Sequence, residues 1–361
     1  MAFFHYNNIH IAGVASAVPT QIVKVECFAE RFGKETVERF SKMTGVKEFR
    51  KTLEHQTASD LGFAAAEHLL QVKQIKRDEI GALVFIAHSV DYRRPATACV
   101  LHKRLGLSKE CAAFDIGLGC SATVYGLQAA GSMMANSDIT KALLITGESL
   151  TKMVNPDDKS VAMLFGDGAS AILLEKKEDC PVDILLRTDG NGYNAIIAPA
   201  GGYRNMDAPR KDEVWPDGNV RNLYNTYMNG TDVFSFTISE VPVAIRDFIK
   251  KTGVGVDEYD CFAFHQANQF ISKQLAKKFK IPMEKMPLCL DRYGNTSAPA
   301  ATMALCDRYG KIEDEVIKTM FCCFGVGLSW GVASATINTD DILPIIETDE
   351  IFDEGIINEP F

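Results

Sequence analysis

Three residues whose side chains together suit nucleophilic catalysis stand far apart in the chain: Cys120, His265 and Asn295. Cys120 follows the glycines Gly117 and Gly119 and precedes a run that is apolar on nearly all helical faces. This pattern predicts a thiol at the N-terminus of a buried helix. Unpaired N–H groups and the helix dipole favour a thiolate there, so we expect a lowered pKa and a nucleophile near neutral pH.

His265 and Asn295 are the candidate partners of this thiol. His265 ends the apolar run 261–264 and precedes an expected helix, which places it at the C-terminal edge of a strand, where ligands bind in α/β sheets. Asn295 lies in the turn 293–299. Taken singly, His265 can also be a hydrogen-bonded core residue and Asn295 only a turn residue.

Internal similarity indicates a duplicated chain. Residues 85–88 (Phe-Ile-Ala-His) match 262–265 (Phe-Ala-Phe-His), and the matches of 115–122 with 291–298 and of 165–170 with 324–329 follow in the same order. Such collinear matches predict two related halves that meet as pseudo-symmetric partners. The turn around Asn295 would then face the same cavity as the turn around Cys120.

Short apolar runs alternate with helical patterns. We expect strands at 13–19, 82–87 and 142–146 and helices at 34–40 and 60–71, an order typical of an α/β sheet. Residues 189–230 are crowded with Gly, Pro, Asn and Asp and are predicted to form loops and turns. Two interpretations of this stretch stay open: a lid or cavity wall, and a disordered surface insertion.

Composition excludes several classes of protein. The chain has 361 residues, is 47% hydrophobic and carries a net charge of −9, which argues against nucleic acid as a partner. No apolar stretch is long enough to cross a bilayer, and no basic flank of a signal peptide is present, so a cytoplasmic protein without membrane association is expected. The ten cysteines lack zinc or disulfide spacing and are expected to be mostly buried, reduced thiols.

The motifs resemble those of the β-ketoacyl-acyl-carrier-protein synthase III family of the thiolase superfamily, over roughly residues 8 to 338. The residues that carry the likeness are 119–122 (Gly-Cys-Ser-Ala), 164–169 (Leu-Phe-Gly-Asp-Gly-Ala), 265–268 (His-Gln-Ala-Asn), 294–297 (Gly-Asn-Thr-Ser) and 324–331 (Phe-Gly-Val-Gly-Leu-Ser-Trp-Gly). The resemblance implies an α/β fold, the duplicated, five-layered αβαβα thiolase fold, and a homodimer. It also implies that Cys120, His265 and Asn295 form the catalytic set.

The resemblance further implies a two-step condensation. Cys120 accepts an acyl group from a thioester, with the oxyanion held by the backbone N–H groups of Cys120 and of the turn around Val326. A malonyl thioester then loses carbon dioxide while His265 and Asn295 stabilise the enolate. The implied substrates are acyl-CoA or acyl-ACP and malonyl-ACP, with no cofactor and no metal.

Departures from the family pattern bear on the acyl donor. Arg39 and Met43 stand where the family has the Trp and Arg that grip coenzyme A, and Lys152 stands where it has another Arg. Lysine keeps the charge but lacks the planar fork that stacks on adenine. Arg94 replaces an aromatic residue that lines the partner subunit's acyl pocket. We therefore expect an unusual acyl group or delivery by a carrier protein.

An acyl carrier protein is acidic, so its docking surface is expected to be basic. The candidate carrier or coenzyme A contacts are Arg39, Lys152, Asn268, Lys273 and Lys277. The last two belong to a cluster near His265 that also holds Lys250, Lys251, Lys278 and Lys280. A solvated lysine-rich face explains the same cluster without any partner.

The predicted organisation has four parts. An N-terminal thiolase half with the nucleophile spans 1–180, connecting loops span 181–230, and a C-terminal half with His265 and Asn295 spans 231–338. The extension 339–361 carries eight acidic and no basic residues, and it either packs along the surface or is disordered.

Three alternative functions compete with condensation. A papain-like cysteine protease uses Cys, His and Asn in the same order, but its Cys-Gly-Ser-Cys-Trp signature is absent and it needs no duplicated framework. An acyltransferase of the same fold, acting on an alcohol or amine, would not need the enolate-stabilising pair. A non-catalytic partner subunit would be expected to lack Cys120.

Overall fold

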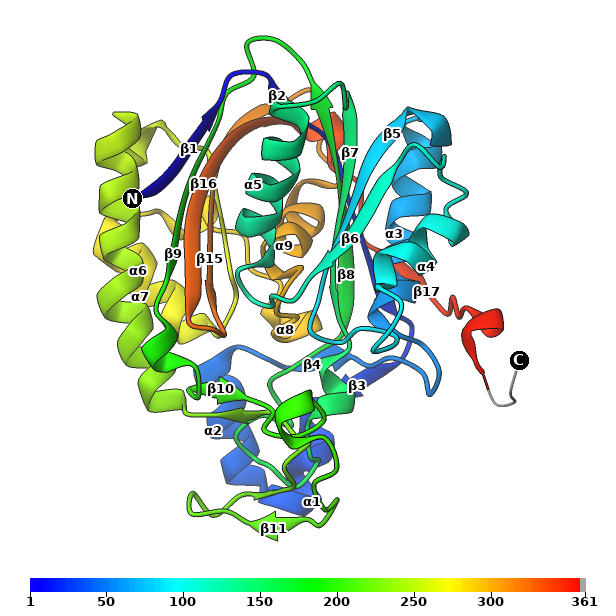
Figure 1. Ribbon diagram of the computed structural model, residues 1–361. Coiled ribbons are helices and arrows are strands. Elements are labelled where there is room, and N and C mark those ends of the chain that lie inside the picture. Colours follow the sequence, from blue (N-terminus) through cyan, green and yellow to red (C-terminus); the bar gives the residue numbers. More distant parts are fainter. Residues whose placement is uncertain (358–361) are drawn as a thin grey trace.

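The computed structural model describes residues 1–357, and two mixed β-sheets form its centre (Figure 1). Buried apolar residues fill the space between the sheets and cover their outer faces. The six-stranded sheet contains, in spatial order, β17 (Ile346–Thr348), β2 (Ile9–Pro19), β8 (Gly168–Lys176), β7 (Lys141–Glu148), β5 (Ile80–Ile86) and β6 (Ala112–Ile116). The five-stranded sheet contains β1 (Ala2–Tyr6), β9 (Val182–Thr188), β16 (Ser329–Asn338), β15 (Val316–Gly325) and β14 (Cys261–Phe264).

The two sheets repeat one pattern of pairing. In the first, β2 and β8 are antiparallel, β8 and β7 are antiparallel, and β7 and β5 are parallel. In the second, β9, β16, β15 and β14 pair in the same order with the same directions. The duplication predicted from the internal matches is therefore present in the topology.

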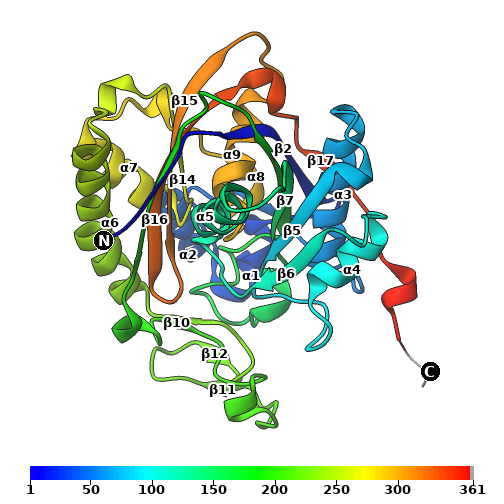
Figure 2. The same cartoon turned by 45° about the horizontal axis from the view of Figure 1, so that its top comes forward.

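Helices form the three remaining layers. The helices α5 (Ala122–Ala135) and α9 (Ala300–Tyr309) lie between the sheets, and Figure 2 shows α5 nearly end-on in that position. The outer face of the six-stranded sheet is covered by α3 (Ala58–Val72) and α4 (Thr97–Arg104), and that of the five-stranded sheet by α6 (Gly230–Thr252) and α7 (Gln269–Phe279). The order helix, sheet, helix, sheet, helix is the predicted five-layered arrangement.

The apolar patterns explain where these helices lie. Both faces of α5 contact a sheet, which matches its nearly continuous apolar sequence. By contrast, α3 buries one face, and its N-terminus is closed by a capping box between Thr57 and Asp60. The predicted strands at 13–19, 82–87 and 142–146 lie within or overlap β2, β5 and β7, and the predicted helix at 60–71 lies within α3.

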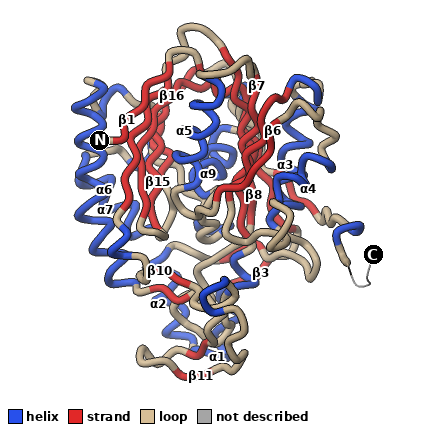
Figure 3. Tube along the Cα trace, in the orientation of Figure 1, coloured by secondary structure: helices blue, strands red, loops and turns tan. Residues whose placement is uncertain are grey.

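A region with few regular elements lies at one end of the two sheets and is drawn mostly as loops in Figure 3. It includes α2 (Lys34–Thr44), which runs four residues beyond the predicted helix because Gly45, with φ of +86°, provides the left-handed residue that ends it. The stretch 189–230 contains only short elements, as predicted. The short elements of this region are β3 (Ile22–Lys24), α1 (Ala29–Phe32), β4 (Glu48–Arg50), β10 (Ile196–Ile197), β11 (Glu213–Val214), β12 (Val220–Arg221), β13 (Tyr227–Met228) and α8 (Leu290–Tyr293).

The C-terminal extension packs along the surface over the part that is described. Strand β17 adds to the edge of the six-stranded sheet beside β2, and the chain then crosses α4. The Arg104 guanidinium binds Asp60 at 2.7 Å and Glu350 at 3.1 Å and lies over the ring of Phe352. Residues 358–361 of the predicted extension lie outside the described residues.

Both ends of the chain cross the predicted boundaries of the halves. Strand β1, from the first part, pairs with β9 in the second sheet, and β17, from the extension, joins the first sheet. The boundaries at 180, 230 and 338 stay a prediction. Within residues 1–357, no helix is both long and apolar enough to span a bilayer.

Candidate active site

Cys120 lies where the sequence places it, two residues before the first residue of α5. The turn between β6 and α5 is closed by the Ala122 N–H, which donates to the carbonyl of Gly119 at 2.8 Å. The side chain is 8% exposed. The sulfur therefore stands at the amino end of the central helix, at the bottom of a cavity.

The turn after β15 approaches this sulfur closely. A Cβ atom added to Gly325 would lie 2.6 Å from the Cβ and 2.8 Å from the Sγ of Cys120. Any larger residue would displace the thiol, so glycine is required there for a steric reason. The close approach brings the backbone of Val326 next to the sulfur, and its N–H faces the thiol.

One cavity of about 1110 Å³ collects the residues that the sequence separates. Cys120, His265, Asn295 and Val326 all line it. His265 follows β14, and Asn295 follows α8, so the second half supplies both partners of the first half's thiol. The predicted convergence of thiol, imidazole and carboxamide at one pocket is present in the fold.

Ser297, which the sequence analysis did not single out, links two of these groups. Its hydroxyl lies 3.3 Å from the Cys120 sulfur, and its backbone N–H donates to the Asn295 Oδ1 at 2.9 Å. Because the carboxamide oxygen is occupied in this way, the Nδ2 amino group of Asn295 is the end available to a ligand. The Thr-Ser pair directly after Asn295 is the sequence feature that could have indicated a hydroxyl at this place.

The motif 164–169 supports the Asn295 turn. The Asn295 N–H donates to the carbonyl of Leu164, and a Cβ on Gly166 would lie 2.1 Å from the carbonyl of Tyr293. Behind it, the buried Asp167 carboxylate accepts hydrogen bonds from the backbone N–H and hydroxyl groups of Thr52 and Thr151. The glycine-rich motif is thus a support that brings two backbones into contact.

Burial determines the protonation state of His265. The imidazole is 2% exposed, its Nδ1 has no hydrogen-bond partner within the described residues, and Phe324 packs edge-on against the ring. Removal from water lowers the pKa of His265 to about 4, with the backbone of Ser297 acting weakly in the opposite direction. The ring is therefore neutral at pH 7 and carries one N–H.

The expected lowering of the Cys120 pKa is wrong. Burial raises the pKa of this thiol, and the negative charge of Glu148 adds to the effect. The Ser297 hydroxyl and the backbone N–H groups of Val326 and Cys120 oppose the rise without cancelling it. The sequence showed the helix N-terminus but not the depth of the cavity, and desolvation is the larger contribution.

Comparisons with known proteins identify the family of this chain. The family description 3-oxoacyl-[acyl-carrier-protein (ACP)] synthase III matches residues 114–190, and the description of the C-terminal part of the same family matches residues 249–337. A relative from Campylobacter jejuni, named putative 3-oxoacyl-[acyl-carrier-protein] synthase 3, is 31% identical over 93% of this chain and 96% of its own length. The chain belongs to the 3-oxoacyl-[acyl-carrier-protein] synthase III family.

Solved structures give the same result. A 3-oxoacyl-(acyl-carrier protein) synthase from Burkholderia xenovorans superposes with a TM-score of 0.89 and 34% identity over 96% of this chain and 99% of that chain. In the comparison with curated proteins, a beta-ketoacyl-[acyl-carrier-protein] synthase III from Caldanaerobacter subterraneus is 32% identical over 89% of this chain and 95% of its own length. The predicted thiolase fold, α/β and duplicated, is confirmed.

The cavity that Cys120, His265 and Asn295 line, which we call the synthase cavity, is lined by only some of the predicted carrier contacts. Arg39 and Asn268 line the cavity, but Lys152 does not, because its Nζ turns away and donates to the carbonyl of Glu54 at 2.5 Å. Lys159, seven residues later, lines the cavity instead. Lys273 and Lys277 lie on α7 outside the lining, and Arg94 does not line the cavity of its own chain.

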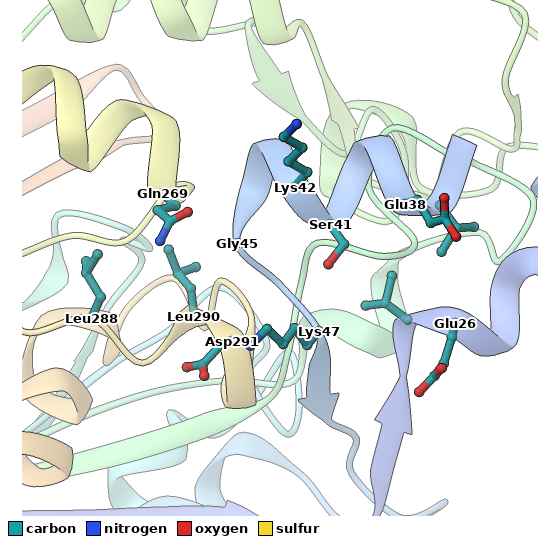
Figure 4. Close-up of a pocket in the computed structure, with 12 residues that line it drawn as sticks. Glu26, Glu38, Ser41, Lys42, Gly45, Lys47, Gln269, Leu288, Leu290 and Asp291 are labelled. Atoms are coloured by element: carbon teal, nitrogen blue, oxygen red, sulfur yellow. The ribbon is translucent and has the colours of Figure 1, made fainter. Parts of the chain in front are cut away.

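Helix α2 separates the synthase cavity from a second one of about 850 Å³ (Figure 4). Arg39, Phe40 and Met43 line the first cavity. Glu38, Ser41 and Lys42 line the second, together with Gln269 and Asp291. At the end of the helix, a Cβ on Gly45 would lie 2.8 Å from the Cβ of Gln269, so α2 contacts the start of α7 directly.

Proposed function

We propose that this chain is a condensing enzyme that joins a Cys120-bound acyl group to a malonyl thioester and releases carbon dioxide and a 3-oxoacyl thioester. One observation carries the proposal: a thiol from the first half and an imidazole and carboxamide from the second half line a single cavity. Membership of the synthase III family supports the same reaction, since relatives of this chain bear that name.

In the first half-reaction, the sulfur of Cys120 attacks the carbonyl carbon of an acyl thioester. The backbone N–H groups of Cys120 and Val326 hold the tetrahedral oxyanion, and collapse of the intermediate expels the first thiolate. The proton of Cys120 leaves with that thiol. Because burial raises the pKa of Cys120, the attack requires the proton to move as the sulfur–carbon bond forms.

In the second half-reaction, a malonyl thioester enters the cavity after the first thiol has left. The single N–H of the neutral His265 ring and the Nδ2 group of Asn295 donate to its thioester carbonyl. Carbon dioxide leaves, the enolate carbon attacks the acyl carbonyl, and the Cys120 sulfur departs and regains a proton. Every step uses side chains and backbone groups alone, so no cofactor is invoked.

The partners belong to the same proposal. The substrates are acyl-CoA or acyl-ACP and malonyl-ACP. An acidic acyl carrier protein docks near α7, with Lys273 and Lys277 outside the cavity and Arg39, Asn268 and Lys159 on its wall. A homodimer would allow Arg94 to reach the partner's acyl pocket. A cytoplasmic location completes the proposal.

Mass spectrometry of the intact protein tests the acyl-enzyme. After incubation with an acyl thioester, an adduct is expected on wild type and on Cys99→Ala, which removes an exposed thiol, but not on Cys120→Ala. Addition of malonyl thioester should then discharge the adduct as a 3-oxoacyl product. Discharge only by an added alcohol or amine would instead support an acyltransferase of the same fold, and an adduct on another cysteine would contradict the assignment.

A further inference from the structure

His88 brings a second imidazole to the synthase cavity. Its side chain lines the cavity, and a Cβ placed on Gly119 would lie 2.9 Å from the Cδ2 of His88 and 3.1 Å from the Oγ of Ser297. The ring therefore borders the same small space as the hydroxyl that contacts the Cys120 sulfur. Neither half-reaction described above uses it.

The backbone around His88 is held firmly by a buried carboxylate. Glu148 accepts hydrogen bonds from the N–H of His88 at 3.0 Å, the N–H of Ser89 at 3.2 Å and the hydroxyl of Ser89 at 2.7 Å. The Ser89 oxygen in turn accepts from the N–H of Ser149 at 2.9 Å. This network sets the place of the His88 ring beside the nucleophile.

The ring of His88 is available to a ligand. Within residues 1–357, the ring nitrogens Nδ1 and Nε2 of His88 form no hydrogen bond, and only the backbone N–H of this residue does. The cavity wall is largely apolar and includes Leu150, Met163, Phe165 and Ile196. The His88 side chain is exposed in the single chain, so its ring nitrogens lose contact with water when a ligand fills the cavity and then need a polar group on that ligand. The acyl chain on Cys120 is the part of the substrate that lies next to it.

Charge restricts the kind of polar group. Glu148 is fully buried behind His88, and burial raises the pKa of its carboxyl, while the nearby His88 ring and hydrogen bonds from Ser89 and the His88 backbone oppose the rise. A carboxylate on the bound acyl group would place a second acidic group near this carboxyl, and each of the two would disfavour the ionised form of the other. A neutral hydroxyl avoids this repulsion and can both donate to and accept from an imidazole.

We propose that His88 is a specificity-determining residue that hydrogen-bonds a neutral hydroxyl group of the acyl chain close to the thioester. Acyl donors with such a hydroxyl are then preferred to plain alkyl donors and to donors that end in a carboxylate. The inference rests on the proposed function, because it requires the acyl group to be carried on Cys120.

Single-turnover acylation with three pantetheine thioesters tests this. The butyryl, 3-hydroxybutyryl and succinyl thioesters differ in one substituent and need neither the nucleotide nor a carrier protein. For wild type, we expect the Cys120 adduct to form about tenfold faster from the hydroxyacyl donor than from the butyryl donor, the effect of about one hydrogen bond. The succinyl donor should be the slowest.

Variants assign the preference to the ring. His88→Phe keeps the ring but not the nitrogen atoms, and should bring the ratio of hydroxybutyryl to butyryl rates close to one, while His88→Gln should restore part of it. His68→Phe, on the outer helix α3, serves as the matched control and should keep the wild-type ratio. Thermal unfolding of each variant verifies that the fold is retained.

Three results would overturn the inference. A wild-type ratio near one, an unchanged ratio in His88→Phe, or a succinyl rate that equals the hydroxybutyryl rate would each contradict the hydroxyl preference while leaving the condensing function intact. If none of the three donors acylates Cys120, the proposed function itself fails, and the role of His88 fails with it.

Discussion

The turns that follow β5 and β14 occupy equivalent places in the two halves, and each begins with a histidine on the wall of the same cavity. We call them the His88 turn (88–91) and the His265 turn (265–268). In the His265 turn the imidazole is almost fully buried and neutral, whereas in the His88 turn the side chain is exposed in the single chain. Duplication thus preserved the position of a ring and changed its surroundings.

Different anchors hold the two turns. The neutral carboxamide of Gln266 holds the His265 turn, donating to the carbonyl of Ala300 at 3.1 Å and accepting from the N–H of Cys289 at 2.9 Å. The carboxylate of Glu148 holds the His88 turn. The carboxamide places no ionisable group beside the ring that we expect to stabilise an enolate. The Glu148 carboxyl, whose pKa is raised by burial, lies instead beside a ring to which we assign only a binding role.

The largest effect, on malonyl decarboxylation, is expected from truncating His265 or Asn295, and a much smaller one from truncating His88. His265→Ala and Asn295→Ala should each lower the rate of malonyl decarboxylation by about 10²–10³-fold, since each removes a donor to the developing oxyanion. His88→Ala should lower it by less than about tenfold, because we assign it no contact with the enolate.

Cys120 acylation, followed by mass spectrometry, provides the control for this comparison. In His265→Ala and Asn295→Ala it should be affected much less than decarboxylation. Equal loss of both half-reactions in these variants, or an equal effect of the two histidine variants on decarboxylation, would remove the division of roles between the turns.

Acid should destabilise the fold through His265. The folded-state pKa of about 4 lies below the usual 6.5, so the unfolded chain binds a proton first as the pH falls. The corresponding stability is fully present above pH 6.5 and is lost between pH 6.5 and 4, with an expected size of about 3 kcal/mol. Urea unfolding of wild type and His265→Asn at pH 7.5 and 4.5 measures it, and an equal loss in both proteins would refute the assignment.

Removing the carboxyl anchor of the His88 turn should cost less free energy of unfolding. Glu148→Ala leaves two backbone N–H groups and a hydroxyl without their acceptor, and we expect a loss of about 2 kcal/mol in the free energy of unfolding. Denaturant titration at pH 7 gives this value. Glu148→Gln, which retains an acceptor oxygen, should recover part of the loss, and a variant as stable as wild type would show that the network does not hold the His88 turn.

The smallest effect concerns a contact made just after the His88 turn. Next along the chain, the Tyr92 hydroxyl donates to the carbonyl of Gly355 at 2.6 Å and so connects this region to the C-terminal extension. Tyr92→Phe should lower the free energy of unfolding by about 1 kcal/mol. Denaturant titration checks this, with Tyr203→Phe, whose ring is on the surface, as the control.

Much of the site was predictable because its parts lie in short motifs. The glycines before Cys120 and the apolar run after it predict the helix N-terminus, and the matches between the halves predict that Asn295 faces the same cavity. The choice of Lys152 over Lys159 as a contact was not predictable in this way. Both are lysines in one irregular segment, and only the path of the backbone decides which of them lines the cavity.

The residues that support the site were also outside the reach of the sequence. Ser297 is an ordinary turn residue until its hydroxyl is found 3.3 Å from the Cys120 sulfur, and Glu148 is one of many acidic residues until its burial is known. The same holds for the extension after residue 338, whose acidity is compatible with disorder until Arg104 is seen to bind Glu350.

The sequence by itself determined the residue types of the site, the duplicated order of elements and the helix that begins after Cys120. These properties depend on local chain patterns and on side-chain chemistry, which can be recognised without coordinates. The tertiary structure alone decided the depth of the cavity, and with it the raised pKa of Cys120, the neutral state of His265 and the presence of a second imidazole beside the thiol. Desolvation and contact depend on atoms from distant parts of the chain, and only folding brings these together.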